Sequence, residues 1–439
     1  MRIAYITAGA AGMYCGSCMH DNTLVAALHR QGHDALLVPT YTPIRTDEDD
    51  VSQKRVFFGG INVYLQQKFW LFRHTPWLLD RLLDVPRLLR WVSRFAMKTQ
   101  AQDLADLTVS MLKGEHGKQR KEVAKIVRWL AVELRPQLVN LTNALLSGMV
   151  HELKRHLNVP ILCSLQGDDI YLESLPEPAR TECLKLIRDH CREMDGFVAT
   201  STYYADFMSG YFSIPRERIH VVHPGLNLRG HGGEREPERG VETTLQRGSR
   251  TIGYFARICP EKGLHVLTEA FRLLRRLPGV PACKLRISGW LGEQNKPYLQ
   301  KLLKELDAAG LGGDVEHVES PDHASKVRFL QSLDVLSVPT TYREPKGLYV
   351  LEALANGVPV VQPRHGSFPE LIAATGGGLL VNPEDPADLA RGLRRLIDNP
   401  AEATELGRRG KAAVFERFHA ERMARETVDV YARYVPSHP

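Results

Sequence analysis

The sequence predicts an α/β protein with two Rossmann-like domains, and three observations carry this prediction. Short apolar runs alternate with helical patterns along the chain, which is typical of parallel strands joined by crossover helices. A glycine-rich, charged segment interrupts the alternation at residues 225–250. The chain of 439 residues is also about three times as long as one average domain.

The first domain, residues 1–224, is expected to begin with a buried strand. Its opening apolar run ends at Thr7, where glycines follow, and is too short for the hydrophobic part of a signal peptide. Amphipathic stretches between the apolar runs predict helices, for example at Thr23–Arg30, Val150–His156 and Glu182–Glu193. The predicted strands of this domain are Ile3–Thr7, Ala35–Val38, Leu138–Leu141, Ile161–Ser164 and Phe197–Thr200.

An interdomain linker is expected at residues 225–250, which read GLNLRGHGGEREPERGVETTLQRGSR and contain few large apolar residues. The alternation resumes in a second domain, residues 251–418. We expect the final segment, residues 419–439, to form a helix that crosses back to the first domain. The predicted strands of the second domain are Thr251–Phe255, Lys284–Ser288, Val335–Pro339, Val358–Val361 and Leu379–Val381.

The composition argues against a membrane-spanning, fibrous or largely disordered chain. Apolar residues make up 43% and charged residues 25%, and no stretch approaches about 18 consecutive apolar residues. Seven cysteines are an odd number scattered over a long chain, unlike the disulfide framework of a secreted protein. The sequence therefore predicts a soluble protein of the reducing cytoplasm.

Residues 51–135 are expected to form a basic helical insertion in the first domain. This segment holds 16 Lys and Arg against 7 Asp and Glu, whereas the whole chain has a net charge of +6. Within it, residues 75–98 combine an apolar stripe with a row of cations, as in helices that lie on the anionic inner face of a membrane. Ordinary surface helices show the same pattern. Packing on the first domain, where it would shape an acceptor pocket or a dimer contact, is the favoured alternative.

A glycine-bearing loop follows the first predicted strand and leads into a helix. Gly12 and Gly16 would let the backbone approach a ligand, and the first N–H groups of the helix favour phosphate. Tight turns need glycine as well, so a ligand site and a plain turn are equal alternatives. His20, Asp21 and Asn22 lie where we expect the helix to start and could contact an acceptor. Asp21 or Asn22 could equally cap the helix.

Two cysteines, Cys15 and Cys18, fall inside this loop. A C-x-x-C pair can be half of a zinc site or a redox pair. No second pair of ligands lies at a matching spacing, and the context is not thioredoxin-like. Small residues that allow a tight turn are the favoured interpretation.

The second domain opens with a strand and a loop that carries two cations, Arg257 and Lys262, on either side of a proline turn. Ligands of open α/β sheets bind at the carboxyl ends of strands, where two cations can converge on a diphosphate. The alternative is a pair of solvated surface cations. The phosphate-compatible loop of the first domain favours the diphosphate.

Two glutamates, Glu344 and Glu352, flank the start of a helix that is expected near Gly347. A carboxylate held by free N–H groups at a helix N-terminus can accept hydrogen bonds from the hydroxyls of a ribose or a hexose. Alternatively, Glu344 only caps the helix and Glu352 is an exposed helical acid.

This stretch resembles the glutamate motif of family 4 retaining glycosyltransferases, which have the GT-B fold of two Rossmann-like domains facing each other across a cleft. Lys346 stands in place of the usual aromatic residue of the pattern E-x-F-G-x-x-x-x-E-A-x-A-x-G-x-P-V-V. Arg257 and Lys262 match the element G-R-x-x-P-E-K-G, in which Ala256 replaces a common glycine. The resemblance covers residues 1–50 and 136–435. The other matching positions are Glu344, Gly347, Glu352, Ala353, Ala355, Gly357, Pro359, Val360, Val361, Gly366 and Glu370.

The resemblance implies a role for each matched residue. Arg257 and Lys262 would neutralise the donor diphosphate while the glycosidic bond breaks, and Glu344 would touch the donor sugar. Glu352 would bind the ribose hydroxyls. The remaining donor-side positions are Gly12, Gln166, Gly347 and Leu348, and the acceptor-side positions are Gly16, His20 and Asp168.

One departure from the family concerns Gln166, which stands where a histidine often contacts the donor sugar. Glutamine can hydrogen-bond a sugar hydroxyl but cannot carry a proton. Retaining transfer in this family is usually described as front-face attack with no required protein base, so glutamine is compatible with activity. Because of this replacement, the resemblance does not say which sugar the enzyme prefers.

The sequence therefore predicts a retaining, hexosyltransferase-type enzyme that moves a sugar from a nucleoside diphosphate sugar to a hydroxyl of a lipid, glycan or small molecule. No cofactor, metal or nucleic-acid partner is expected. One alternative is a glycogen- or sucrose-synthase-like enzyme, which the segment Val56–Leu65 faintly suggests. The other is a catalytically silent module that binds nucleotide sugars, an alternative that Gln166 and Lys346 keep open.

Overall fold

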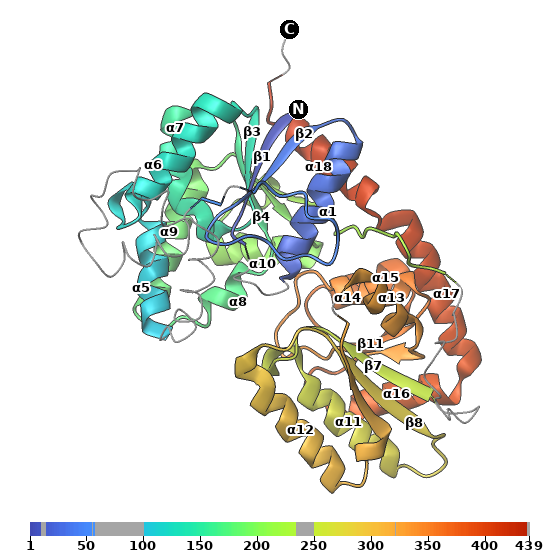
Figure 1. Ribbon diagram of the computed structural model, residues 1–439. Helices are drawn as coiled ribbons and strands as arrows, with labels where there is room; N and C mark the ends of the chain where they lie inside the picture. The colour runs from blue at the N-terminus through green and yellow to red at the C-terminus, as the bar shows by residue number, and fades with distance from the viewer. Residues whose placement is uncertain (10–14, 55, 58–100, 234–249, 321, 437–439) are drawn as a thin grey trace. The chain divides into compact units, whose positions relative to one another are not determined.

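The structure is a computed structural model that describes residues 1–9, 15–54, 56–57, 101–233, 250–320 and 322–436. Gly12, the amphipathic segment 75–98, most of Val56–Leu65 and most of the linker 225–250 lie outside the described residues. The chain divides into two compact units (Figure 1). Unit 1 is Met1–His223 with Met423–Pro439, and unit 2 is Pro224–Arg422.

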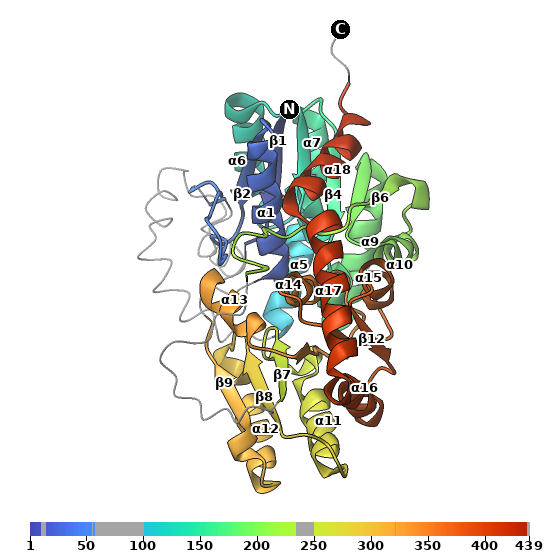
Figure 2. The same cartoon turned by 90° about the vertical axis from the view of Figure 1, so that its right-hand side faces the viewer.

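Unit 1 contains a six-stranded sheet in the order β2-β1-β3-β4-β5-β6, and all its strands are parallel. The strands are β1 (Arg2–Thr7), β2 (Asp34–Pro39), β3 (Leu138–Leu141), β4 (Ile161–Leu165), β5 (Gly196–Ala199) and β6 (Ile219–Val221). The helices are α1 (Gly16–Arg30), α5 (Ala101–Leu112), α6 (Arg120–Trp129), α7 (Val150–His156), α8 (Asp168–Leu172), α9 (Ala179–Glu193), α10 (Thr202–Phe212) and α18 (Ala420–Ala432), which contributes its residues from Met423 onward. Helices α1 and α18 lie side by side along the sheet (Figure 2).

The central strands of unit 1 are buried from end to end. Every residue of β3 and β4 is buried, as expected for parallel strands that helices cover on both faces. The sequence predicted β1 to β5 but missed β6, a three-residue strand at the edge of the sheet. Two of its three residues are only half-buried, so β6 carries little of the apolar signal that marks a central strand.

Part of the predicted insertion packs into the core of unit 1. The core includes Val109 and Leu112 of α5 and Ile126 and Val127 of α6, in the same apolar cluster as the residues of β3 and β4. The described residues 101–135 of the insertion therefore contribute to the core of unit 1. The basic row at 75–98 lies outside the described residues.

Unit 2 contains a second parallel six-stranded sheet, in the order β12-β11-β10-β7-β8-β9. Its edge strand β9 was not predicted, because it is short and two of its four residues are exposed. The strands are β7 (Arg250–Phe255), β8 (Cys283–Ser288), β9 (Val315–Val318), β10 (Val335–Leu336), β11 (Val360–Pro363) and β12 (Gly378–Val381). The helices are α11 (Leu264–Arg276), α12 (Lys296–Ala308), α13 (His323–Gln331), α14 (Leu348–Ala355), α15 (Phe368–Thr375), α16 (Pro386–Asp398) and α17 (Pro400–Arg417).

The helices of unit 2 differ in burial, because α14 is buried at every residue from Tyr349 to Ala355 whereas α11 buries one face. Helix α11 buries Leu267, Phe271 and Leu274 and carries Arg275 and Arg276 in its last turn. Within the described ranges, none of the helices has the length and apolar character that a bilayer crossing requires. The prediction of an α/β protein with two Rossmann-like domains is confirmed.

Each sheet has one position where the strand order changes direction. In unit 1 this position lies between β1 and β3, and in unit 2 between β7 and β10. In open α/β sheets, ligands bind outside the carboxyl ends of the strands at this switch point. The two polar clusters described below each lie at the switch point of their own unit.

Candidate functional site

A buried ion pair joins two loops at the switch point of unit 2. Lys262 Nζ lies 2.7 Å from Oε2 of Glu344, and the two side chains are 11% and 6% exposed. Lys262 follows β7, and Glu344 follows β10. The two residues are 82 positions apart and meet because β7 and β10 are neighbours in the sheet. The alternative that Lys262 is a solvated surface cation is therefore wrong.

Two glycines allow these loops to close on the ion pair. Gly263 has a φ of +73°, and a Cβ on it would lie 1.8 Å from the carbonyl oxygen of Pro339. Gly366 has a φ of +60°, and a Cβ on it would lie 2.6 Å from the backbone nitrogen and oxygen of Glu344. Both positions combine a left-handed conformation with a backbone contact that a side chain would block.

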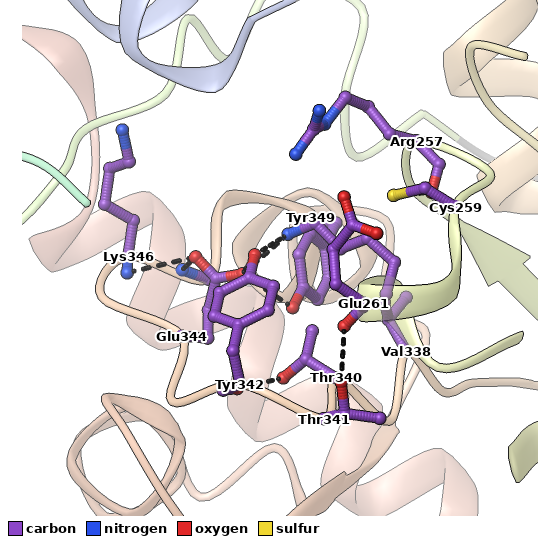
Figure 3. Close-up of polar contacts among 12 residues, drawn as sticks. Arg257, Cys259, Glu261, Val338, Thr340, Thr341, Tyr342, Glu344, Lys346 and Tyr349 are labelled. Atoms are coloured by element: carbon purple, nitrogen blue, oxygen red, sulfur yellow. Dashed lines mark hydrogen bonds and ion pairs between the residues drawn. The ribbon is translucent and has the colours of Figure 1, made fainter. Parts of the chain in front are cut away.

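The carboxylate of Glu344 also binds the N-terminus of α14. Its Oε1 accepts the backbone N–H of Lys346 at 3.3 Å and that of Gly347 at 3.4 Å. Gly347 immediately precedes α14, with a φ of +68°, and Leu348 is the first helical residue. Figure 3 shows the Lys346 side chain extending away from the carboxylate while its N–H points toward it. Capping is thus one part of what Glu344 does.

Two tyrosines that the sequence analysis did not single out complete the surroundings of Glu344 (Figure 3). The hydroxyl of Tyr342 donates to Oε2 at 2.8 Å, and that of Tyr349 donates to the same oxygen at 3.1 Å. Lys262 also donates to the hydroxyl of Tyr342. Its Nζ lies 5.0 Å from the centre of each tyrosine ring, a distance at which a cation is attracted to an aromatic face.

The electrostatics of the cluster keep Glu344 ionised. Burial on its own would raise the pKa of Glu344, but the charge of Lys262 and hydrogen bonds from Lys262 and Tyr342 lower it to about 2. Burial and the adjacent carboxylate raise the pKa of the Tyr342 and Tyr349 hydroxyls well above the usual value. The tyrosines therefore stay protonated and act as donors to a permanent anion.

Glu352 lies on α14 and forms a second buried ion pair. Its Oε1 is 2.8 Å from Nζ of Lys326 on α13, and the side chains are 8% and 5% exposed respectively. The alternative that Glu352 is an exposed helical acid is therefore wrong. Lys326 was also missed, because it lies 26 residues upstream of Glu352 and no local spacing connects the two.

Arg257 lies on the loop after β7 and is half-buried. Its carbonyl oxygen accepts the hydroxyl of Tyr254 at 3.0 Å, which fixes the backbone of the loop. Figure 3 shows its guanidinium group set apart from the Glu344 carboxylate. The structure thus pairs Lys262 with Glu344 and Glu352 with Lys326, and it places Arg257 on the same loop as Lys262.

A second polar cluster surrounds Asp21, a fully buried residue at the switch point of unit 1. The hydroxyl of Tyr5 donates to its Oδ1 at 2.9 Å, and that of Thr7 donates to its Oδ2 at 3.1 Å. Gln166 Nε2 donates to Oδ1 at 2.9 Å, and the hydroxyl of Thr142 donates to Oδ2. Side chains on or just after β1, β3 and β4 therefore converge on one carboxylate of α1.

The start of α1 differs from the prediction. The helix begins at Gly16 with Cys15 as its N-cap residue, one turn earlier than expected. Asp21 and Asn22 lie inside the helix and are fully buried, so the expectation that one of them caps it is wrong. Cys18 lies in the first helical turn and Cys15 is the residue before it, so the pair spans the start of a helix rather than a tight loop. Among the described residues, there is no group of three or more His, Cys, Asp and Glu that could hold a metal ion.

Gln166 and Asp168 hold the loops after β3 and β4 together. The Gln166 side-chain amide also donates to the carbonyl of Thr142 at 3.2 Å. Asp168 is 2% exposed and accepts the N–H of Ala144 at 2.6 Å and that of Gln166 at 3.1 Å. Burial raises the pKa of Asp168 to about 6, although these two N–H groups oppose the shift.

The acceptor-side positions differ in exposure. Gly16 is exposed at the start of α1, whereas His20 is 7% exposed, with Nδ1 3.4 Å from Oδ1 of Asp21. His20 faces a small hollow between α1, α18 and the ends of β4 to β6. The hollow is lined by His20, Leu24, Ser164, Gln166, Val198, Thr200, Val222, Thr427 and Tyr431.

Comparison with protein families gives two matches that together span most of the chain. Residues 22–225 match the model of the glycosyl transferase 4-like domain. Residues 238–413 match the model of glycosyl transferases group 1. The first match lies in unit 1 apart from its last two residues, and the second lies within unit 2.

Similar proteins and structures agree with these families. The D-inositol 3-phosphate glycosyltransferase of Arthrobacter sp. is 30% identical over 304 residues, which are 65% of this chain and 69% of that protein. Its counterpart in Nocardioides sp. is 29% identical over 308 residues, 66% of this chain and 65% of that protein. The chain thus spans about two thirds of the length of these curated relatives.

Two solved structures share the fold along the whole chain. Sucrose-phosphate synthase from Thermosynechococcus elongatus has a TM-score of 0.73 at 18% identity and covers 99% of both chains. Anabaena HepE in complex with UDP has a TM-score of 0.69 at 16% identity and covers 99% of this chain and 100% of HepE. These two structures confirm the fold, and the two family matches together with the Arthrobacter relative show that the chain belongs to the group 1, family 4-like glycosyltransferases.

Proposed function

We propose that this protein is a retaining glycosyltransferase that moves a hexose from a nucleoside diphosphate sugar to an acceptor hydroxyl. The observation that carries the proposal is the buried Lys262–Glu344 pair at the switch point of unit 2, where α/β sheets bind nucleotides. The names of the relatives support a glycosyltransferase, and HepE was solved with UDP.

Arg257 and Lys262 are proposed to bind the donor diphosphate. Both lie on the loop that follows β7, the first strand of unit 2. The leaving nucleoside diphosphate gains negative charge as the glycosidic bond breaks, and preorganised cations lower the energy of that state. In this proposal the two cations supply the charge that a metal would otherwise provide, so a chelator should not reduce the rate.

Glu344 is proposed to face the donor sugar as a fixed anion. Its Oε2 is occupied by Lys262 and two tyrosine hydroxyls, whereas the two amide bonds to Oε1 are long, at 3.3 and 3.4 Å. Oε1 is therefore the oxygen with capacity for a sugar hydroxyl. An ionised carboxylate beside the sugar also stabilises the positive charge that develops on the ring in an oxocarbenium-like transition state.

Glu352 is proposed to bind the ribose hydroxyls of the donor. The ion pair with Lys326 holds its carboxylate in one orientation on the buried helix α14. Gly347 and Leu348, at the start of the same helix, would line the donor site with backbone groups. In this proposal the two ion pairs fix the positions of the Glu344 and Glu352 side chains in the donor site of unit 2.

Unit 1 is proposed to take the acceptor. The acceptor-side candidates Gly16 and His20 lie on α1, and Gln166, which we propose to contact the donor sugar, is hydrogen-bonded to Asp21 of the same helix. The buried Asp168 carboxylate accepts two backbone N–H groups. We therefore assign it the role of fixing the loops around the acceptor. Contact of residues 75–98 with an anionic inner membrane, which would serve a lipid-linked acceptor, stays a prediction.

The proposal is tested by the release of free nucleoside diphosphate from a panel of UDP-, GDP- and ADP-sugars, with and without anionic lipid vesicles and with and without chelator. Release from one donor is the expected result and names the nucleotide and sugar. Stimulation by anionic vesicles would support the membrane contact. Binding of a donor without release in the presence of a broad set of acceptors would favour the silent binding module instead.

A further inference from the structure

The C-x-x-C pair of unit 1 differs from the other cysteines of the chain. All seven cysteines lie in the described part of the structure. Cys15 is half-buried, whereas the others are at most 3% exposed: Cys18, Cys163, Cys183, Cys191, Cys259 and Cys283. Thiol reactivity depends on access and on thiolate character. One partly exposed cysteine thus lies three residues from a buried one.

The two thiols are within reach of each other. Cys15 is the N-cap of α1 and has an extended backbone, and its carbonyl oxygen accepts the N–H of Met19 at 3.0 Å, so the residues between it and Cys18 are helical. Helical geometry places the Cα atoms of residues i and i+3 about 5 Å apart. A disulfide requires roughly 4.4 to 6.8 Å. The Cys15 and Cys18 side chains are already hydrogen-bonded to each other.

The two sulfurs lie in different surroundings, so we expect them to react differently. Cys15 lies at a helix N-terminus, where the free N–H groups and the helix dipole favour a thiolate. The hydrogen bond with Cys15 and burial raise the pKa of the Cys18 thiol well above its usual value, so it stays protonated. Cys15 is therefore the thiol that meets an oxidant first, and Cys18 is positioned to resolve the product.

We propose that Cys15 and Cys18 form a reversible, peroxide-sensitive dithiol at the start of α1. The Cys15 thiolate attacks one oxygen of hydrogen peroxide, the O–O bond breaks, and the leaving hydroxide takes a proton from solvent to become water. Cys15 is then a sulfenic acid. The Cys18 sulfur attacks the Cys15 sulfur, the S–O bond breaks, and the leaving hydroxide takes the Cys18 proton as a second water. Two thiols are oxidised to one disulfide, and one peroxide is reduced to two waters.

The pair is connected to the polar cluster of unit 1. The hydroxyl of Thr7 is hydrogen-bonded to Cys18 and donates to Oδ2 of Asp21 at 3.1 Å. Oxidation therefore acts on the turn that anchors α1 next to His20 and Asp21. The chemistry of the thiols does not depend on the activity proposed above, and its test needs no sugar donor.

The experiment uses the full chain, reduced and then treated with graded hydrogen peroxide, quenched, alkylated and digested with trypsin. Cleavage after Arg2 and Arg30 gives one peptide, Ile3–Arg30, that holds both cysteines and no others. The expected product is this peptide without either alkyl group and lacking two hydrogen atoms, and a dithiol reductant restores the doubly alkylated form. Oxidation of Met13 or Met19 would add oxygen instead and is thus distinguishable.

Two variants separate the roles of the sulfurs. In Cys18→Ser, Cys15 should accumulate as a sulfenic acid that a cyclic 1,3-dione traps, whereas in Cys15→Ser the buried Cys18 should stay reduced at the same peroxide dose. Thermal unfolding of each variant establishes that it is folded. The proposal is overturned if wild-type Ile3–Arg30 keeps both thiols while Cys18→Ser forms the sulfenic acid. It is overturned equally if Cys15 reacts no faster than the five cysteines outside the pair.

Discussion

Lys262 and Glu344 form an ion pair of 2.7 Å that is almost fully buried and joins loops from two neighbouring strands of unit 2. A buried ion pair is rarely the most stable solution, because well-packed apolar residues of similar volume often give equal or greater stability. The tyrosine hydroxyls and backbone N–H groups around Glu344 reduce this cost without removing it. The burial of the pair supports its proposed role, which is to hold charge in place for a ligand.

Breaking one side of the pair should destabilise the protein more than removing both sides. Lys262→Met leaves a buried carboxylate without its cation, which we expect to cost about 3 kcal/mol or more of unfolding free energy. The double variant Lys262→Met/Glu344→Gln should lose less unfolding free energy than Lys262→Met alone. Chemical denaturation followed by circular dichroism measures these differences.

The chain offers a matched control for this cycle. Lys296 and Glu293 form an ion pair of the same 2.7 Å length in the same unit, but their side chains are 49% and 78% exposed. Neutralising either residue should change the unfolding free energy by no more than about 1 kcal/mol. Equal effects at the buried and the exposed pair would contradict the electrostatic account of the site.

The ion pair should also give unit 2 an acid-sensitive stability. The pKa of Glu344 is about 2 in the folded chain against an ordinary value of 4.5. A carboxyl with a lowered pKa stabilises the fold fully above about pH 4.5 and loses this contribution as the pH falls toward 2. The stability difference between wild type and Glu344→Gln should therefore shrink over this window. A difference that stays constant from pH 6 to pH 2.5 would show that Glu344 is not paired as described.

Asp168 should have the opposite pH dependence. Its pKa is raised by burial from 3.8 to about 6, so the folded state holds a proton that the unfolded state has released. The stability that this group contributes falls as the pH rises from about 4 to 6, by up to about 3 kcal/mol. Asp168→Asn removes the titration, and the difference from wild type measured across pH 4 to 7 should show the slope. A flat difference would mean that Asp168 is more solvated than its 2% exposure implies.

The two glutamates should be essential for sugar transfer, and Lys326 should matter through Glu352. We expect Glu344→Ala and Glu352→Ala to abolish measurable transfer. For Glu344, which is proposed to face the charge that develops on the sugar, the rate should fall by at least about 100-fold. Lys326→Met should weaken donor binding and raise KM more than it lowers kcat, because it releases the Glu352 carboxylate from its fixed position. Initial rates at varied donor concentration separate the two effects, and Glu293→Ala is the matched exposed control. Unchanged rates in both glutamate variants would remove the basis of the site assignment.

Local patterns in the sequence predicted the elements that position the site. The alternation of apolar runs identified ten of the twelve strands that the described residues form in the two sheets, and so the loops that carry Arg257, Lys262 and Glu344. The two missed strands, β6 and β9, are short edges with little apolar content. The start of α1 was placed too late, because Gly16, Ser17 and Cys18 are weak helix formers and the turn depends on the tertiary contacts of Asp21.

The partners of the site residues were harder to predict. Tyr342 and Tyr349 are seven residues apart and lie on either side of Glu344 in the sequence. Their closeness to the glutamate could have predicted that their hydroxyls bind it. Lys326 and Asp21 gave no such signal, because their partners come from distant segments that meet only in the folded sheets. Residue types and spacing thus indicated the candidate site residues, whereas the networks that hold their side chains depend on topology.

The most direct test of the account is a crystal structure of the chain with an intact or non-hydrolysable nucleotide sugar. The account predicts diphosphate oxygens within about 3.2 Å of both Arg257 and Lys262, and the ribose hydroxyls at the same distance from Glu352. It also predicts a sugar hydroxyl on Oε1 of Glu344. A nucleotide bound elsewhere, with the Lys262–Glu344 and Lys326–Glu352 pairs untouched by it, would contradict the central claim.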